Sequence, residues 1–214
     1  MRTIETQVYT FTELSEDAKE RAREWYRRGM DYDTYWHEFI YDDANTIAEI
    51  IGIQIDTAPV TLMDGSKRYK PAISFSGFYS QGDGACFTGR YQYAKGSCKA
   101  IRSYAPQDAE LHRIADELQA IQKRHFYMLD SRITQSGNYC HARTMRVETY
   151  WDYSADGYPS IDTQDEVEQL IRDFADWIYR QLEKEYEYQN SDEAIDESIE
   201  CNGYEFNDQG ELIQ

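Results

Sequence analysis

The stretch DTQDEVEQLIRDFADWIYRQLEKEYEY (residues 162–188) carries the strongest structural pattern in the sequence. Its apolar residues recur every three or four positions, as they do on one face of an α-helix. These residues are Val167, Leu170, Ile171, Phe174, Ile178 and Leu182. A second stripe is acidic and is centred about 150° around the helix from the first. It consists of Glu166, Asp173, Asp176, Glu183 and Glu187. The pattern predicts a long helix with one packed face and one acidic, exposed face.

Similar reasoning predicts the other elements along the chain. Helices are expected at 15–29, 34–51 and 107–125. Strands are expected at 3–10, 53–63, 69–78, 85–93, 126–135 and 138–152, with turns at Asp64-Gly65 and Ser136-Gly137. This order predicts the α+β class, with a mostly antiparallel sheet of about five or six strands and four helices.

The domain organisation follows from the same pass along the chain. We expect residues 1–189 to form a single α+β domain, since no glycine- or serine-rich linker interrupts them. Residues 190–214 carry acids almost alone and are expected to form an acidic C-terminal tail. A short hairpin within this tail is expected to turn at Asp208-Gln209-Gly210.

Charge is spread unevenly over the 214 residues, whose formal net charge is −18. Residues 31–64 contain eight acids and no base, and residues 151–214 contain 19 acids and three bases. By contrast, residues 65–105 contain seven bases and one acid. Such asymmetry indicates a charged binding surface, and an acidic protein that is merely soluble is the alternative.

The composition argues against several classes of protein. With 41% hydrophobic and 14% aromatic residues, the chain is too apolar to be wholly disordered. No apolar run approaches the ~18 residues of a membrane span, so no membrane association is expected. The first 30 residues carry six acids, unlike a signal or transit peptide. The cysteines form no CxxC pair and the histidines no ligand-spaced array, so we expect no metal, no cofactor and reduced thiols.

The loop SQGDGACF (80–87) is the most unusual stretch of the sequence. Two glycines flank Asp83, and glycine allows a backbone to approach a ligand closely. The loop could bind an anion through its N–H groups, or it could be a tight strand connection in which Asp83 forms a local turn. The residues of this candidate ligand contact are Ser80, Gln81, Gly82, Asp83 and Gly84.

His141 is the second candidate for chemistry and is expected in the middle of a strand. If it faced Asp83, the two could act as a general acid–base pair in a small hydrolase or nuclease. A structural histidine is the alternative. Further candidates, which could help to hold a divalent metal, are His37, Glu38, Asp42 and Asp43.

Three stretches resemble a family of small bacteriophage and prophage proteins that are often labelled as antitoxins of a toxin–antitoxin stability system. They are SFSGFYSQGDGACFTG (74–89), SGNYCHARTMRVE (136–148) and FTELSEDAKERAREW (11–25). The resemblance covers most of the first 150 residues, and SQGDGA is its specific motif. It carries over no catalytic residue. It implies a phage accessory protein that is expressed in the cytoplasm of the host bacterium.

Together these observations predict a non-enzymatic inhibitor of a bacterial defence or nucleic-acid-handling complex, of the anti-CRISPR or anti-restriction type. Its acidic surface would mimic nucleic acid and bind a basic groove of that complex. The expected partner-binding residues are the acidic stripe above together with Asp192, Glu193, Asp196, Glu197 and Glu200.

Several alternatives stay open at this point. An antitoxin that neutralises a basic toxin would use the same electrostatics, and an enzyme would use Asp83 and His141. Direct nucleic-acid binding through the basic, aromatic segment 65–105 is opposed by the net charge of −18. A homodimer that pairs the basic with the acidic segment is a further alternative.

Overall fold

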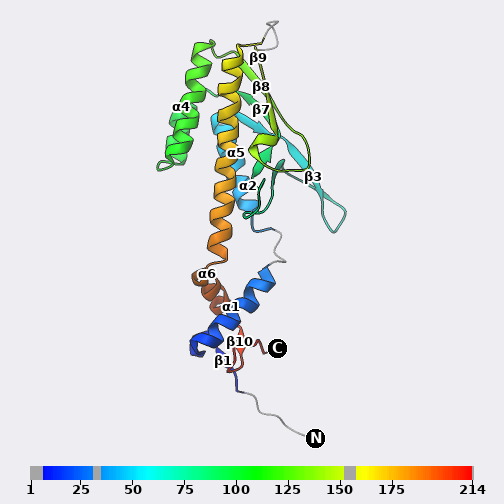
Figure 1. The fold of residues 1–214 in the computed structure, drawn as a ribbon, viewed down its shortest axis with the longest axis vertical. Helices are drawn as coiled ribbons and strands as arrows, with labels where there is room; N and C mark the ends of the chain where they lie inside the picture. The colour runs from blue at the N-terminus through cyan, green and yellow to red at the C-terminus, as the bar shows by residue number, and fades with distance from the viewer. Residues whose placement is uncertain (1–6, 31–34, 152–157, 214) are drawn as a thin grey trace. The chain divides into compact units, whose positions relative to one another are not determined.

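The computed structural model describes residues 7–30, 35–151 and 158–213 (Figure 1). Within these residues the chain forms six α-helices and ten strands, and every strand pair is antiparallel. The predicted α+β class is therefore confirmed. The predicted counts are wrong, because the strands form four separate sheets and two helices were not expected.

The elements have the following bounds. The helices are α1 (Glu16–Met30), α2 (Glu38–Ile51), α3 (Ser97–Tyr104), α4 (Ala109–Arg124), α5 (Ile161–Gln189) and α6 (Asp192–Asn202). The strands are β1 (Tyr9–Thr10), β2 (Ile53–Ile55), β3 (Thr57–Thr61), β4 (Lys67–Pro71), β5 (Ile73–Phe75), β6 (Ala85–Phe87), β7 (Gly89–Gln92), β8 (Leu129–Gln135), β9 (Met145–Trp151) and β10 (Glu205–Phe206).

The chain divides into two compact units. The terminal unit comprises residues 1–37 and 183–214, and the central unit comprises residues 38–182. This division differs from the expected single domain 1–189 with a separate tail. The reason is that the first helix and the C-terminal segment share one core, so the two ends of the chain belong to the same unit.

The central unit is built on a four-stranded sheet in the order β2-β7-β8-β9. One row of cross-strand partners is buried on all four strands, because alternate strand residues face the same side. The row consists of Ile53, Tyr91, Ser131 and Thr149. The hydroxyls of Ser131 and Thr149 lie 3.0 Å apart and hydrogen bond to each other, which satisfies both buried polar groups.

Helix α5 contributes its first part to the core of the central unit. Phe174 is fully buried, and its ring packs edge to face against Phe87 of β6 at 5.8 Å. The helix was predicted at 162–188 and its bounds are confirmed to within one residue at each end.

Within the described residues no helix combines the length and the apolar character needed to cross a membrane.

Two predicted elements differ from the structure in ways that affect the candidate sites. The strand expected at 138–152 begins only at Met145, because Ala142–Thr144 form a short 3-10 helix. His141 caps that helix, so its predicted mid-strand position is wrong. The helix expected at 34–51 begins at Glu38, and residue 34 lies outside the described residues.

Helices α3 and α6 were missed because each buries only two residues, too few for a clear apolar stripe. In α6 these are Ile195 and Ile199, and most of the remaining side chains are acidic. Its start nevertheless has a cap, since the Ser191 hydroxyl accepts a hydrogen bond from the Ala194 N–H.

The terminal unit has a core of its own. It is formed by buried residues of α1, α6, β10 and the 3-10 turn (Phe11–Glu13) that precedes α1: Phe11, Leu14, Ala18, Ala22, Ile195, Ile199 and Phe206. Strand β1 pairs with β10, which joins the two ends of the chain. After β10 the chain turns, and Phe206 pairs with Leu212 in an antiparallel bridge at the place of the expected hairpin.

Replacing Phe206 with Ala should unfold the terminal unit selectively. The Phe206 ring is fully buried and packs edge to face against two other rings. Its centre lies 6.5 Å from the ring centre of Phe11 and 5.9 Å from that of Trp25. Its loss should cost about 3–5 kcal/mol of local stability. Hydrogen-exchange mass spectrometry should show faster exchange in α1 and α6 with unchanged protection of β8 and β9. Equal loss of protection in both units would contradict a separate core.

Candidate partner-binding surface

The loop at 80–84 and the segment around His141 lie next to each other in the central unit. The Ser76 N–H donates to the Gly84 carbonyl at 3.1 Å, and the Ser76 hydroxyl donates to the Cys140 carbonyl at 3.4 Å. A Cβ atom on Gly84 would lie 2.5 Å from the Cβ of His141, so only glycine fits at this position. The two motif segments therefore meet, by close backbone packing.

The side chains of Asp83 and His141 both accept hydrogen bonds from the local backbone. A carboxylate oxygen of Asp83 accepts from the Ser80 N–H at 2.7 Å, and the Asp83 N–H donates to the Ser80 carbonyl at 3.1 Å. The Nδ1 atom of His141 accepts from the Arg143 N–H at 3.1 Å. These are the bonds of a tight turn and of a helix cap, and they favour the structural interpretation of both residues.

Two of the candidate acids on α2, Glu38 and Asp43, are engaged elsewhere, and Asp42 is exposed. Glu38 accepts from Arg68 at 3.1 Å and pairs with Lys70, whose ammonium group holds the pKa of Glu38 below its usual value. Asp43 accepts from the Tyr104 hydroxyl at 2.5 Å. In the part of the chain that the structure describes, no group of three or more His, Cys, Asp or Glu side chains is placed to hold a metal ion.

Cys86 is buried in β6, directly after the 80–84 loop, and is unsuited to act as a nucleophile. Burial raises the pKa of its thiol to about 12, and the nearby Cys140 thiol adds to the shift. Since the thiolate is the reactive form, Cys86 is almost wholly protonated at neutral pH.

A substitution at Gly84 tests the close packing of the loop on His141. Gly84→Ala should lower the free energy of unfolding by about 2 kcal/mol or more, because the new methyl group has no room. The matched control is Gly29→Ala in α1, where a Cβ meets nothing within 4 Å. That change should raise helix stability by up to ~1 kcal/mol. Denaturant unfolding of both variants checks this, and a neutral Gly84→Ala would rule out the tight contact.

The acidic stripe of α5 is partly neutralised within the central unit. Glu166 pairs with Arg124, and Asp173 accepts from Arg113 at 2.5 Å, both bases belonging to α4. Partial burial raises the pKa of Asp176, so its carboxylate becomes protonated at a higher pH than that of an exposed aspartate. This part of the expected partner-binding stripe therefore serves largely to attach α4 to α5.

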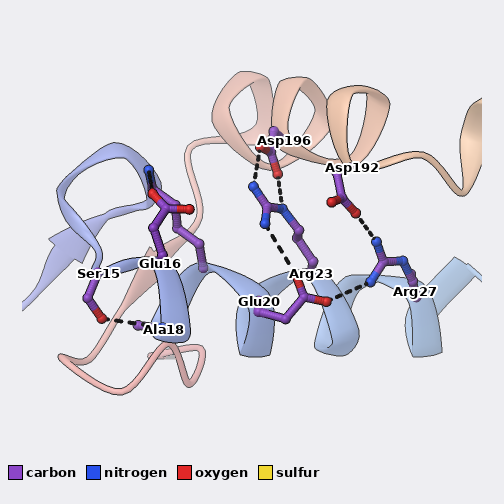
Figure 2. A network of polar contacts seen from close by, with 9 residues as sticks. Ser15, Glu16, Ala18, Glu20, Arg23, Arg27, Asp192 and Asp196 are labelled. Atoms are coloured by element: carbon purple, nitrogen blue, oxygen red, sulfur yellow. Dashed lines mark hydrogen bonds and ion pairs between the residues drawn. The ribbon is translucent and has the colours of Figure 1, made fainter.

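Two of the acids predicted on the tail are neutralised by α1 (Figure 2). The Arg23 guanidinium donates to both carboxylate oxygens of Asp196, at 2.6 and 2.7 Å. One turn further along, Arg27 pairs with one carboxylate oxygen of Asp192. Glu20 accepts from both arginines, at 3.2 and 3.3 Å. These contacts hold α6 against α1 and take Asp192 and Asp196 out of the set of free acids.

The other predicted acids form no ion pair within the described residues. Glu193, Glu197 and Glu200 are exposed on α6, at spacings of four and three that place them on one face. Glu183 and Glu187 lie on the last turns of α5 and belong to the same unit. We call Glu193, Glu197 and Glu200 the acidic face of α6.

The terminal unit carries most of the net charge of the protein. Its 69 residues contain 19 acids and seven bases, a net charge of −12 out of −18. The acidic face of α6 therefore lies in a strongly negative field, which attracts cationic partners and repels phosphate.

A groove of about 1060 Å³ lies within this unit. Its lining comprises Trp25, Tyr26, Arg28, Gly29, Glu185, Tyr188, Gln189, Ala194, Glu197, Ser198, Cys201, Asn202 and Tyr204. The Trp25 ring packs edge to face on Tyr204 at 5.2 Å, and Tyr26 packs on Tyr204 at 6.4 Å. Tyr188 is 55% exposed. The groove thus combines aromatic rings with the carboxylates of Glu185 and Glu197.

Sequence reasoning missed this groove because its lining comes from both ends of the chain, residues 25–29 and 185–204. One signal was available in the sequence. Arg23 and Arg27 are four residues apart, as are Asp192 and Asp196. Two helices that carry complementary charges at matching spacing are candidates for pairing.

Comparison with known proteins adds a family but no function. Residues 36–192 match the family model described as Domain of unknown function (DUF8835). The chain belongs to this family. The match includes the whole central unit and leaves most of the terminal unit outside it. No curated protein and no solved structure matches the chain.

A double-mutant cycle measures how strongly α1 holds α6. Arg23 and Asp196 are 13% and 28% exposed, so the cycle Arg23→Ala and Asp196→Ala should give a coupling energy of about 1–3 kcal/mol. The comparison pair, Arg124 and Glu166, is 57% and 46% exposed and should give ~0.5 kcal/mol. Denaturant unfolding supplies all values, and similar couplings would show that the Arg23–Asp196 contact is no more than a surface pair.

Proposed function

We propose that this protein is a phage-encoded, non-enzymatic inhibitor of a bacterial defence or nucleic-acid-handling complex, of the anti-CRISPR or anti-restriction type. The terminal unit binds the complex, in the cytoplasm of the host bacterium. The observation that carries the proposal is the net charge of −12 on this unit, with the unpaired acidic face of α6 exposed. Such a surface competes for the Lys- and Arg-lined groove that a defence enzyme uses for phosphate.

The spacing of the acids supports mimicry of a single strand better than mimicry of a duplex. Residues 193 to 200 span about 10 Å of helix axis and carry three exposed carboxylates, one per ~5 Å. One strand of DNA carries a charge about every 3.4 Å, and a duplex carries twice as many. The face therefore has about two-thirds of the linear charge density of one strand, and its binding should weaken as salt rises.

The motif resemblance of residues 74–89 favours a second candidate, an antitoxin that neutralises a basic toxin. It would use the same acidic face and the same electrostatics. The two candidates differ in what they relieve: the inhibitor relieves restriction of an incoming phage, whereas the antitoxin relieves growth arrest by a co-expressed toxin.

The test is the efficiency of plating of phages on bacteria that carry single defence systems and express this protein. The test variant removes the acidic face of α6 through Glu193→Gln, Glu197→Gln and Glu200→Gln. The matched control removes three exposed acids of the central unit through Asp42→Asn, Asp162→Asn and Asp165→Asn. Both triple variants change the charge by the same amount.

We expect the wild-type protein to restore plating against at least one defence system. The α6 variant should lose this effect, and the central-unit control and Asp83→Asn should keep it. If no defence system responds, or if the α6 variant is as active as the wild type, the proposal is wrong. Loss of activity in Asp83→Asn alone, with normal folding, would favour the enzyme instead.

A further inference from the structure

The terminal unit already contains one arginine held by an aromatic ring and a carboxylate. The Arg23 guanidinium binds Asp196 through two hydrogen bonds, and it also lies over the Phe11 ring at 5.8 Å from the ring centre. A planar guanidinium satisfies both contacts at once, because its edge donates hydrogen bonds while its face stacks.

The groove of the terminal unit offers the same two kinds of group to a partner. Its aromatic side is formed by Trp25, Tyr26, Tyr188 and Tyr204, and its carboxylates are Glu185 and Glu197. We propose that this groove binds an arginine side chain from a basic segment of the protein partner. The inference rests on the proposed function, because it names the chemistry by which the acidic terminal unit recognises its target.

Two side chains of the lining are available to a partner. Glu197 is exposed and has no ion pair or hydrogen bond within the described residues. Tyr188 is 55% exposed, and its ring is large enough to cover a guanidinium. Glu185 accepts one hydrogen bond, from the Gln189 side chain at 2.7 Å, and a carboxylate has capacity for more.

Charge and size favour a basic protein segment as the occupant. The lining contains two carboxylates and one guanidinium, that of Arg28, within a unit of net charge −12. This negative field repels the phosphate groups of a nucleic acid. A volume of about 1060 Å³ can hold several side chains, which suits a short peptide segment better than a single ion.

The affinity of capped peptides for the full chain tests the inference. The probe is the hexapeptide Ala-Arg-Ala-Ala-Arg-Ala, blocked at both ends. Two comparison peptides replace both arginines, one with lysine and the other with the neutral isostere citrulline. Isothermal titration calorimetry in low salt measures the affinities, and the indole N–H signal of Trp25 in an NMR titration, assigned with Trp25→Phe, reports on the groove.

Paired variants separate the groove from general charge attraction. Glu197→Gln removes a carboxylate of the lining, and Glu205→Gln makes the same charge change in the same unit, outside both the lining and the acidic face of α6. Tyr188→Ala removes an exposed ring of the groove, and Tyr158→Ala removes a 75% exposed ring from the central unit. Circular dichroism checks that all four variants remain folded.

We expect the arginine peptide to bind at least about threefold more tightly than the lysine peptide. A lysine ammonium group cannot stack its face on a ring while it donates two parallel hydrogen bonds to a carboxylate. Glu197→Gln and Tyr188→Ala should each weaken binding about three- to tenfold. Glu205→Gln and Tyr158→Ala should each change it less than about twofold. The Trp25 signal should shift with the arginine peptide and stay in place with citrulline.

Equal affinity for the arginine and lysine peptides, with equal losses in Glu197→Gln and Glu205→Gln, would show diffuse charge attraction and overturn the inference about the groove. The plating result would still stand in that case. Conversely, arginine-selective binding without any plating effect would contradict the proposed function and still support arginine binding in the groove. Self-association of the chain that Tyr188→Ala abolishes, without peptide binding, would assign the groove to a second copy and also overturn the inference.

Discussion

The pairing of two arginines on α1 with two aspartates on α6 is the contact on which the terminal unit depends. Both pairs have the same four-residue spacing, so they set α6 in one register on α1. In that register Ile195 and Ile199 enter the core beside Phe206. The acidic face of α6 is then necessarily turned outward, because its residues lie on the opposite side of the helix.

This arrangement explains how a strongly acidic segment can be both structural and available for binding. The acids on the inner side of α6 are neutralised by guanidinium groups, which limits the repulsion that a net charge of −12 imposes on the unit. The acids on the outer side are exposed and form no ion pair within the described residues. Arg23 binds a carboxylate and an aromatic ring inside the unit, and this is the chemistry that we propose for a partner at the groove.

The success of prediction from sequence varied with the number of residues that carry each pattern. Helix α5 was located almost to the residue because six apolar positions repeat along it. Helix α6 was missed because it rests on Ile195 and Ile199 alone. The strand around His141 was predicted to begin too early, since alternation of residue types cannot show that a capped 3-10 turn precedes the strand. Of the ten acids expected to bind a partner, four form ion pairs inside the protein: Glu166, Asp173, Asp192 and Asp196.

The sequence by itself determined the α+β class, the long amphipathic helix and the excess of acid in the C-terminal third. These properties are local, since periodicity and charge are read over neighbouring residues. Only the tertiary structure decided which carboxylates stay free and which rings line a groove. Arg23 and Asp196 are 173 residues apart in the chain, and no local pattern specifies that they meet. Their contact depends on the packing of two helices from opposite ends of the sequence around one small core.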